Sequence, residues 1–351
     1  MNNLEFHMDI PELTKFPERL LIDFNGACNL SCKMCMVHGD NPEKDKFATA
    51  DKDRIMDPRK LEKVLDEIVA SGEKLPQVWT ALNGEPLFGP HYIENVTMLK
   101  ERGFTVLSHT NGILLDKKMS QFIIDIGLDV LSCSFDAITP ETYKIIRQSN
   151  LFDRVVANLK QLIELRGDSK TPRIEVSMTV QEENEHEVDE FLEYWSEYVD
   201  VIRINATFTP GKAVYGANFT LPKERTTCAS LYQTMPLFWD GHMGLCCLDP
   251  FGKAKIGNAF ESTLEEVWNG KTLNKVREIH EQGQGERIDL CKGCENWASF
   301  DYEEEITDKF LIRRSRNYAY YNVLSRLSNW TDKIRGTHES VKLDEAMSSN
   351  A

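Results

Sequence analysis

Up to about residue 210, short apolar runs and amphipathic stretches follow one another along the chain in a repeating order. The apolar runs predict strands at residues 20–24, 77–82, 104–108, 130–135, 173–180 and 201–208. The stretches between them have helical periodicity. Six alternations of this kind predict an α/β fold with a parallel sheet and helices outside it. The alternation alone would suit a partial barrel and a doubly wound sheet equally well.

The predicted helix that follows the first strand shows the signals clearly. Asp57 is a favourable N-cap, and Pro58 takes the first helical position. Leu61, Val64 and Leu65 then recur at intervals that place them on one helical face. Similar patterns predict helices around 92–99, after 116, after 140, at 152–166 and around 188–195.

The pattern divides the chain into four parts. Residues 1–17 form an N-terminal extension, 18–210 the α/β core, 211–300 a smaller cysteine-rich domain, and 301–351 a C-terminal helix with a polar tail. The helix is expected within 310–330, where it packs on the core or forms a contact between two copies of the chain, as in a homodimer. The polar residues from Glu339 onward are expected to fray.

Composition restricts the classes of protein that fit. The chain has 351 residues, with 41 Lys and Arg against 56 Asp and Glu, so its formal net charge is −15. It has no long basic run, which disfavours nucleic acid as a partner because phosphate backbones are bound through basic patches. It also has no signal-peptide core and no apolar run of membrane-spanning length. A soluble, cytoplasmic protein is expected, in which clustered thiols indicate metal ligands rather than disulfides.

Three of the nine cysteines, Cys28, Cys32 and Cys35, lie close together after the first predicted strand. In barrel folds of parallel strands the chemistry lies at the C-terminal ends of the strands, which is where this loop falls. Three thiolates hold three irons of a cubane cluster and leave the fourth iron open to a small chelating ligand. The alternative is a zinc knuckle, for which His38 is the nearby candidate for a fourth ligand.

The CxxxCxxC spacing resembles the signature of the radical S-adenosylmethionine (SAM) enzymes. The resemblance implies a partial (β/α)6 barrel of the TIM type and a 4Fe–4S cluster whose open iron binds the amino and carboxylate groups of SAM. It also implies reductive cleavage of SAM to a 5′-deoxyadenosyl radical, which abstracts a hydrogen atom from the substrate. A flavodoxin- or ferredoxin-type protein is then expected as the electron donor.

Polar segments after the later predicted strands resemble the SAM-binding elements of the same family. Asn83-Gly84-Glu85-Pro86 resembles its GGEP motif, with Asn in place of the first glycine. Each segment taken singly is also ordinary turn chemistry, but their order and placement agree. The residues that the resemblance assigns to SAM are Gly84, Glu85 and Pro86 after the second strand, Asn111 in a TNG element after the third, Ser134 and Asp136 at the end of the fourth, Arg147 for the SAM carboxylate, and Met34 in place of an aromatic residue near the adenine.

The remaining thiols gather beyond residue 210. Cys228, Gly241 and Cys246 have a spacing that resembles the opening CX9–15GX4C element of SPASM and twitch extensions in radical SAM enzymes. With the CxxC pair Cys291 and Cys294 they supply four thiolates, enough for one fully ligated auxiliary 4Fe–4S cluster. No cysteine follows Cys294, which favours a twitch-like domain with one auxiliary cluster over a full SPASM domain. A four-cysteine zinc site is the alternative.

Two cysteines are left over by these ligand sets. Cys133 lies between Ser132 and Ser134 on a predicted strand, so its side chain is expected to point to the opposite face, into packing. Cys247 adjoins a predicted ligand and is not needed by the cluster. It has two interpretations: a small buried residue or alternative ligand, or a catalytic thiol that donates a hydrogen atom to a substrate radical in an epimerase.

The sequence says little about the substrate. Peptide-modifying members of the family usually carry an N-terminal leader-binding domain, and only about twenty residues precede the first predicted strand, which favours a small molecule. The twitch-like architecture is also similar to that of an enzyme that dehydrogenates an aminocyclitol alcohol. Oxidation or epimerisation of a carbinol carbon in a sugar or cyclitol is therefore expected. A peptide or protein maturase and a non-catalytic zinc-binding scaffold are the alternatives.

Overall fold

The computed structural model describes residues 12–39, 54–80, 82–206, 224–300 and 302–329 of the chain. Its centre is a series of parallel strands, each paired with the next in sequence. They are β1 (Arg19–Ile22), β2 (Gln77–Trp79), β3 (Thr105–Thr110), β4 (Val130–Ser134), β5 (Arg173–Val180) and β6 (Val201–Ala206). Every strand that the hydrophobic pattern predicts is present. The second ends earlier than predicted, and the last two predicted residues of the sixth lie outside the described part.

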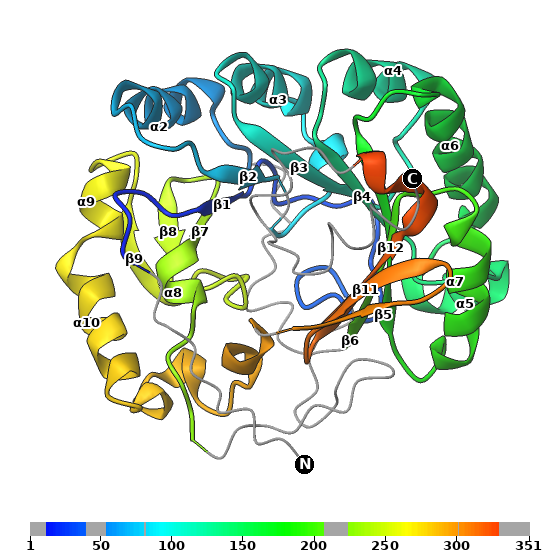
Figure 1. Ribbon diagram of the computed structural model, residues 1–351. Coiled ribbons are helices and arrows are strands. Elements are labelled where there is room, and N and C mark those ends of the chain that lie inside the picture. The colour runs from blue at the N-terminus through cyan, green and yellow to red at the C-terminus, as the bar shows by residue number, and fades with distance from the viewer. Residues whose placement is uncertain (1–11, 40–53, 81, 207–223, 301, 330–351) are drawn as a thin grey trace.

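Helices cover the outer side of these strands and form a curved wall around them (Figure 1). They are α2 (Pro58–Ala70), α3 (Tyr92–Glu101), α4 (Lys117–Asp125), α5 (Pro140–Arg147), α6 (Phe152–Arg166) and α7 (Val188–Ser196). The predicted starts of α2 and α4 are confirmed. The Asp57 side chain accepts from the N–H of Arg59 at the start of α2, and the Asp116 side chain accepts from the N–H of Met119 at the start of α4. The curved sheet with helices on one side is a partial α/β barrel, as predicted.

Alternate residues of each strand face the helices and form the main core. Leu20, Val78, Val106, Leu131 and Ile202 are all fully buried in that cluster, which the apolar faces of the helices complete. Burying the large apolar side chains between sheet and helices stabilises the curved wall. The intervening residues of each strand consequently face the inside of the barrel.

One end of the sheet continues into the cysteine-rich part of the chain. Here β7 (Thr234–Leu237) pairs in parallel with β1, followed by β8 (His242–Gly244) and β9 (Lys255–Asn258). Three helices accompany them, namely α8 (Ser230–Gln233), α9 (Leu264–Trp268) and α10 (Lys271–Glu281). The N–H groups of Leu264 and Glu265 donate to the Glu67 carboxylate on α2 over 2.9 and 3.2 Å. This small domain is therefore joined to the barrel through a shared sheet and through α9.

The C-terminal segment forms strands, so the helix predicted within 310–330 is wrong. β10 (Glu303–Ile306), β11 (Phe310–Arg314) and β12 (Tyr318–Val323) form an antiparallel extension of the sheet, in which β12 pairs with β6. Ser315 turns the chain between the last two strands and accepts from the N–H of Tyr318 over 3.3 Å. Strand pairing with the barrel edge satisfies these backbone groups and overrides the helix-like spacing of the apolar residues.

The same segment fills one end of the barrel interior. Leu311 of β11 and Leu327, in the short 3-10 turn Leu324–Asn329, pack in a second apolar cluster with Val130 of β4 and Leu107 of β3. These partners belong to the inner face of the sheet, so the C-terminal segment packs on the barrel, which is one of the two alternatives expected from the sequence.

Several sequence-based expectations fall on residues that the structure does not describe. These are most of the N-terminal extension, the boundary near residue 210 and the polar tail from residue 339. In the portion of the chain that is described, no helix is both long and apolar enough to cross a membrane.

Candidate iron–sulfur and S-adenosylmethionine site

The loop after β1 carries the first three thiols. Cys32 is buried, and Cys28 and Cys35 are half-buried. The N–H of Cys35 donates to the Cys32 carbonyl over 3.0 Å, and the N–H of Gly39 donates to the Cys35 carbonyl over 3.0 Å. A Cβ on Gly39 would lie 2.5 Å from that second carbonyl oxygen, so the close turn requires glycine. The loop holds the three thiols on a tightly hydrogen-bonded turn.

Two side chains from distant parts of the barrel reach these thiols. Asn111, directly after β3, places Nδ2 at 4.0 Å from the Cys28 Sγ and donates to the Asn29 side-chain oxygen over 2.6 Å. Arg147, the last residue of α5, donates from Nη1 to the Cys32 Sγ over 3.5 Å. The fold therefore brings two of the predicted SAM-binding residues to the predicted cluster ligands.

Arg147 is anchored by Asp136, another residue predicted to bind SAM. Their Nη2 and Oδ2 atoms lie 2.7 Å apart, and both side chains are buried. The other Asp136 oxygen accepts from the N–H of Thr179 over 2.7 Å. Asp136 has a φ of 65°, a conformation that is costly for a residue with a Cβ. Burial raises the pKa of Asp136, and Arg147 opposes this effect.

The Asn83-Gly84-Glu85-Pro86 segment packs against the start of the cysteine loop. A Cβ on Gly84 would lie 1.9 Å from the Asn25 carbonyl oxygen, so only glycine allows this approach. The N–H of Glu85 donates to the Ala27 carbonyl over 2.9 Å. The side-chain oxygen of Asn83 is buried and accepts no hydrogen bond from any described residue. An unsatisfied buried acceptor at this point fits a ligand that donates, such as the amino group of SAM.

The carboxylate of Glu85 links this segment to the end of β3. It accepts from the Thr110 hydroxyl over 2.8 Å, from the N–H of Asn111 over 2.6 Å and from the N–H of Leu87 over 3.2 Å. Burial raises the pKa of Glu85 to about 7, although these hydrogen bonds act in the opposite direction. The contacts observed for this carboxylate order the two segments beside the thiols, a role that the motif alone did not reveal.

The other residues assigned to SAM border the same region. Pro86 is buried at the start of the 3-10 turn Pro86–Phe88. Met34 is half-buried against the main core. Ser134 is half-buried at the end of β4, where it pairs in register with Ser177 of β5.

The donor set of the first loop fits a cluster better than a zinc ion. His38, the candidate fourth ligand, has its Nε2 3.0 Å from the Asn83 carbonyl oxygen. This contact holds the imidazole on a backbone carbonyl, so His38 is not free to act as a fourth zinc ligand in this arrangement. A cubane takes one thiolate at each of several irons instead. Burial raises the pKa of Cys28 to about 12, so binding iron must displace its proton.

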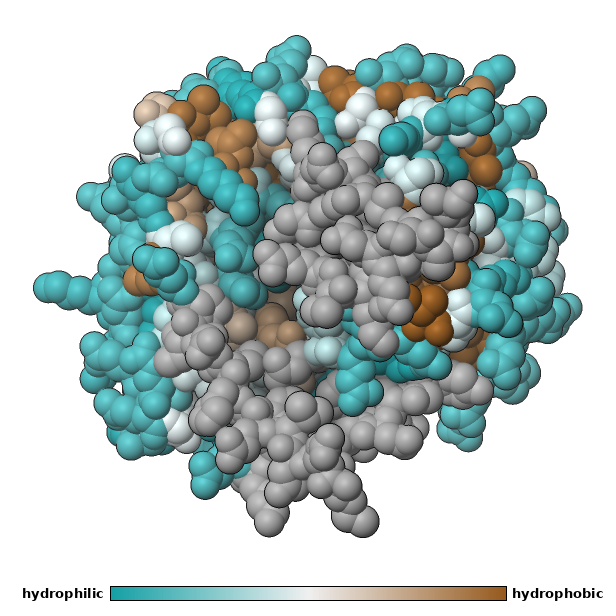
Figure 2. Space-filling view, viewed as in Figure 1, coloured by the Kyte–Doolittle hydropathy of each residue, from teal (hydrophilic) through white to brown (hydrophobic). Residues whose placement is uncertain are grey.

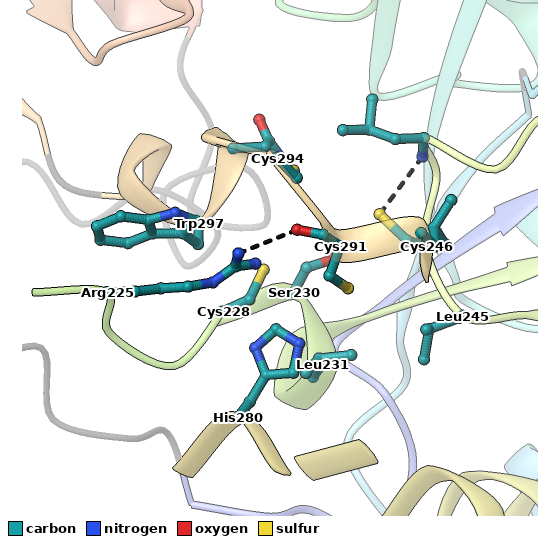
Figure 3. Close-up of a pocket in the computed structure, with 13 residues that line it drawn as sticks. Arg225, Cys228, Ser230, Leu231, Leu245, Cys246, His280, Cys291, Cys294 and Trp297 are labelled. Atoms are coloured by element: carbon teal, nitrogen blue, oxygen red, sulfur yellow. Dashed lines mark hydrogen bonds between the residues drawn. The ribbon is translucent and has the colours of Figure 1, made fainter. Parts of the chain in front are cut away.

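The four predicted auxiliary ligands border one pocket in the small domain (Figure 3). Cys228 precedes α8, Cys246 follows β8, Cys291 ends a 3-10 turn and Cys294 comes three residues later. Leucine side chains from the same elements complete much of the wall, among them Leu231, Leu245, Leu248 and Leu290. Burial raises the pKa of Cys228 to about 12 and that of Cys291 to about 11. The four thiols thus border one pocket although they come from separated parts of the chain, which fits the ligand number of one auxiliary cluster.

Two further side chains that the sequence reasoning did not single out line this pocket. Arg225 donates from Nη1 to the Cys291 carbonyl over 3.0 Å and also pairs with Glu286. His280, on α10, is only 2% exposed. Burial first, and Arg225 second, lower the pKa of His280 to about 4. The helical spacing of His280 from Leu273 and Arg277, which are also buried, was the available signal that it faces inward.

The two left-over cysteines occupy different environments. Cys133 is fully buried, and its Sγ would lie 2.9 Å from a Cβ on Gly112. It therefore packs on the helix side of β4, as predicted. Cys247 is half-buried and is not among the residues that border the four-thiol pocket. Its thiol interacts with that of Cys246, which raises the pKa of Cys246 and lowers that of Cys247.

The inner face of β2 and β3 carries buried polar atoms that have no hydrogen-bond partner within the described ranges of the chain. These atoms are the Gln77 Oε1, the Trp79 Nε1 and the His109 Nδ1. The rings of Trp79 and His109 lie 5.5 Å apart. Burial lowers the pKa of His109 to about 3, with a smaller contribution from Arg203, so its imidazole is neutral. His109 is two residues from Asn111, which places this surface next to the first thiol set.

Charged and hydroxyl groups continue the same inner face on β4, β5 and β6. Arg203 lies with its Nε 3.1 Å from a Glu175 oxygen, and Ser132 donates to that carboxylate over 2.5 Å. Tyr320 of β12 is paired in register with Arg203. Sequence reasoning did not single out these residues, although polar side chains at every second position of an otherwise apolar strand indicate a second, non-core face.

The outer surface around these sites is mostly hydrophilic, with scattered apolar patches on the face that Figure 2 shows. Single apolar side chains on a surface are normal and mark no site by themselves. The chemistry of the chain is therefore concentrated at the two thiol sets and on the inner barrel face.

A partial α/β barrel with three thiols at its mouth and four in an attached domain defines an iron–sulfur enzyme. The family model for the radical SAM superfamily matches residues 22–194, and the model for an iron–sulfur cluster-binding domain, SPASM, matches residues 228–295. The chain belongs to the radical SAM superfamily and carries a C-terminal SPASM domain. It is a radical SAM enzyme that uses SAM, a SAM-binding 4Fe–4S cluster and an auxiliary iron–sulfur centre.

The curated relatives match about half of this chain. A tungsten-containing aldehyde ferredoxin oxidoreductase cofactor-modifying protein of Pyrococcus furiosus is 29% identical over 182 residues, which are 50% of this chain and 47% of that protein. A probable GTP 3′,8-cyclase of Methanothermobacter thermautotrophicus is 27% identical over 187 residues, or 53% of this chain and 56% of that protein. The chain spans about half the length of the curated relatives that it matches.

Solved structures share the fold over most of the chain. The structure of anSMEcpe with bound AdoMet and Cp18Cys peptide has a TM-score of 0.57 at 14% identity and covers 94% of this chain and 98% of its own. The structure of BtrN in complex with AdoMet and 2-DOIA has a TM-score of 0.53 at 17% identity and covers 80% of this chain and 94% of its own. These likenesses support the fold of both the barrel and the attached domain.

Proposed function

We propose that this radical SAM enzyme acts on a carbinol carbon of a sugar or cyclitol, which it oxidises or epimerises. The observation that carries the proposal is the pair of buried polar atoms at Trp79 and His109, on the inner barrel face, that have no hydrogen-bond partner in the described part of the chain. A substrate that binds there displaces water from these polar atoms. It must therefore replace the hydrogen bonds to water with its own donors and acceptors, because an unsatisfied buried polar atom is costly. Closely spaced hydroxyl groups meet that need in a small volume.

The geometry of this surface also suits a compact ring. The Trp79 and His109 rings form an aromatic patch, and the Glu175–Arg203 ion pair lies with Ser132 on neighbouring strands of the same face. Pockets for small polar molecules combine apolar area with a few placed polar groups in this way. A ring with several hydroxyls can lie against the aromatic patch while its hydroxyls reach the charged pair.

The residues that hold the cofactors are assigned from the contacts at the barrel mouth. We assign Cys28, Cys32 and Cys35 as ligands of the SAM-binding cluster. The SAM itself is assigned to Met34, Gly84, Glu85, Pro86, Asn111, Ser134, Asp136 and Arg147, as the family resemblance implies, together with the unpartnered oxygen of Asn83. When bound, these cofactors supply the radical that abstracts hydrogen, with an electron from a flavodoxin- or ferredoxin-type donor. The protein positions the carbinol C–H and excludes water.

The outcome at the substrate carbon depends on the step after hydrogen abstraction. For oxidation, the carbinol loses one hydrogen atom, then an electron and the hydroxyl proton, to give a carbonyl. The auxiliary cluster that we assign to Cys228, Cys246, Cys291 and Cys294 would accept the electron. For epimerisation, a hydrogen atom must instead return to the opposite face. Cys247 is the candidate donor, because it adjoins the predicted ligand Cys246 and the four-thiolate ligand set does not require it. The thiyl left on Cys247 would then need reduction by the external electron donor.

The second candidate function is a peptide or protein maturase. It is favoured by the similar fold of anSMEcpe, whose structure holds AdoMet and a Cp18Cys peptide, over nearly the whole chain. BtrN, whose structure holds AdoMet and 2-DOIA, has a comparable fold. The polar inner barrel face is the observation that favours the first candidate over the second.

Label transfer distinguishes the candidates. Sugars and cyclitols deuterated at the carbinol carbon, and peptides deuterated at their α- and β-carbons, are incubated with the reconstituted enzyme, SAM and a reductant. Deuterium in 5′-deoxyadenosine is expected from a polyol, and it should fall at least tenfold in His109→Phe while substrate-independent SAM cleavage persists. Label arriving only from peptides would overturn the proposal.

Cys247→Ala then separates oxidation from epimerisation. If the enzyme is an epimerase, the variant keeps both clusters and SAM cleavage but loses product, and solvent deuterium no longer enters the product carbon. Unchanged turnover in this variant excludes Cys247 as the hydrogen donor. Cys133→Ala is the matched control, because Cys133 packs on the helix side of the sheet.

A further inference from the structure

His280 is a buried polar side chain that faces the four-thiol pocket. It lies on α10, lines the pocket together with the four cysteines, and is 2% exposed. Neither ring nitrogen has a hydrogen-bond partner among the residues that the structure describes. Figure 3 shows the imidazole directed into the pocket, on the side where Cys228 and Cys291 lie.

The imidazole is held in this place by its surroundings. A Cβ on Gly285 would lie 3.0 Å from the His280 Cε1 and 2.9 Å from the Arg225 Nε, so the chain at Gly285 packs closely on both side chains. The Arg225 Nη1 donates to the Cys291 carbonyl and pairs with Glu286 instead of contacting the imidazole. His280 is thus a fixed group whose nitrogens remain available to whatever fills the pocket.

A buried N–H without a partner is costly, and an imidazole carries at least one N–H in either tautomer. The pocket wall around His280 consists largely of thiols and leucines, including Leu231, Leu245 and Leu290. The thiols become thiolates when they bind iron, and thiolate and sulfide sulfurs accept hydrogen bonds. Four thiolates already ligate four irons, so the cluster does not need the imidazole as a ligand.

We propose that His280 is a positioning residue that donates a ring N–H to a sulfur of the auxiliary cluster and thereby raises its reduction potential. The physical reason is that the reduced cluster carries one more negative charge, which a donated hydrogen bond stabilises more than it stabilises the oxidised cluster. The proposal concerns the auxiliary cluster alone. It stands or falls independently of the substrate proposed above.

The test uses the full chain with Cys28, Cys32 and Cys35 changed to Ala, so that only the auxiliary cluster is present. In this background the midpoint potential is measured by EPR-monitored redox titration for the parent, His280→Leu and His280→Gln. We expect His280→Leu to keep about four irons per chain and to shift to a more negative potential. His280→Gln, which retains an N–H donor, is expected to lie between the two. His91→Leu is the matched control, because His91 pairs with Glu94 outside this pocket, and it should not shift.

A spectroscopic measurement tests the contact directly. With ¹⁵N-labelled histidine, pulsed EPR of the reduced cluster should show a weak nitrogen coupling that disappears in His280→Leu. Three outcomes would overturn the proposal: an unchanged potential in His280→Leu with iron retained, a strong coupling that marks His280 as an iron ligand, or loss of iron in both His280 variants.

Discussion

The two thiol sets of this enzyme lie in contrasting surroundings. Around the first set, Asn111 and Arg147 bring polar and charged groups to Cys28 and Cys32. Around the second, leucines and the buried His280 line much of the pocket, and the charged Arg225 contacts the Cys291 carbonyl rather than a thiol. A three-thiol set must leave one iron open to a polar ligand and therefore needs polar neighbours, whereas a four-thiol set is complete and can be enclosed. The contrast is the one expected if the first set binds the cluster that cleaves SAM and the second holds a cluster that passes electrons, as we propose.

The largest expected effect comes from removing one thiol of the first set. Cys32→Ala removes the thiol that Arg147 contacts, so the open-iron cluster should not assemble and reductive SAM cleavage should fall to the level of cluster-free protein. The measurement is 5′-deoxyadenosine released per enzyme under reducing conditions. SAM cleavage by Cys32→Ala above one tenth of the wild-type rate would contradict the assignment of the first thiol set to the SAM-binding cluster. Cys133→Ala again serves as the control, and its SAM cleavage should persist.

Removing one thiol of the second set should have a different result. Cys246→Ala is expected to lower iron from about eight to about four per chain and to abolish product formation, while substrate-independent SAM cleavage persists. Iron analysis and 5′-deoxyadenosine release measure the two effects separately. Parallel loss of SAM cleavage would mean that the two sites are not independent.

Breaking the ion pair beside the first set should destabilise the fold. Arg147→Met leaves the buried Asp136 carboxylate without its partner, which is expected to lower the free energy of unfolding by about 3–5 kcal/mol. Urea unfolding of the iron-free protein measures this. The double variant with Asp136→Asn should recover part of the loss, because the unpaired charge is then absent. A loss below about 1 kcal/mol in the single variant, as for an exposed pair, would contradict the buried pairing.

A smaller effect depends on pH. Burial raises the pKa of Glu85 from an ordinary value of 4.5 to about 7 in the folded protein. The folded state therefore binds the Glu85 proton more tightly than the unfolded state does. The resulting contribution to the free energy of unfolding is complete below pH 4.5 and is lost as the pH rises to about 7. The full loss is about 3 kcal/mol. Urea unfolding of the iron-free protein between pH 5 and 8 should show this decline relative to Glu85→Gln, whereas parallel curves would contradict it.

The sequence predicted the barrel well because local pattern and tertiary packing agree there. Residues Arg173–Val180 form a strand at the predicted bounds, since β5 lies between two strands and its sequence alternates polar residues with the apolar Ile174, Val176 and Met178, which are buried in the main core. In the C-terminal segment, the helix-like spacing of Leu311, Tyr318 and Tyr321 was misleading. The turn at Ser315 and the pairing of β12 with β6 decide the structure there, and pairing with a distant strand cannot be inferred from local spacing.

In the candidate site, too, contacts between distant segments could not be predicted from local spacing. The thiols could be assigned from spacing because each motif lies within a short stretch of chain, and the polar segments follow predicted strand ends. The hydrogen bonds from Glu85 to Thr110 and Asn111, and the ion pair of Arg147 with Asp136, depend on segments brought together by the fold. His280 likewise meets the four thiols only through the packing of α10.

The central claim is that the two thiol sets hold separate clusters. It is tested most directly by iron and sulfide analysis, after anaerobic reconstitution, of the variant in which Cys28, Cys32 and Cys35 are all changed to Ala. The account predicts about four irons and four sulfides per chain, a brown protein, and no 5′-deoxyadenosine from SAM. A folded, colourless variant with almost no iron, or with one bound zinc, would contradict it.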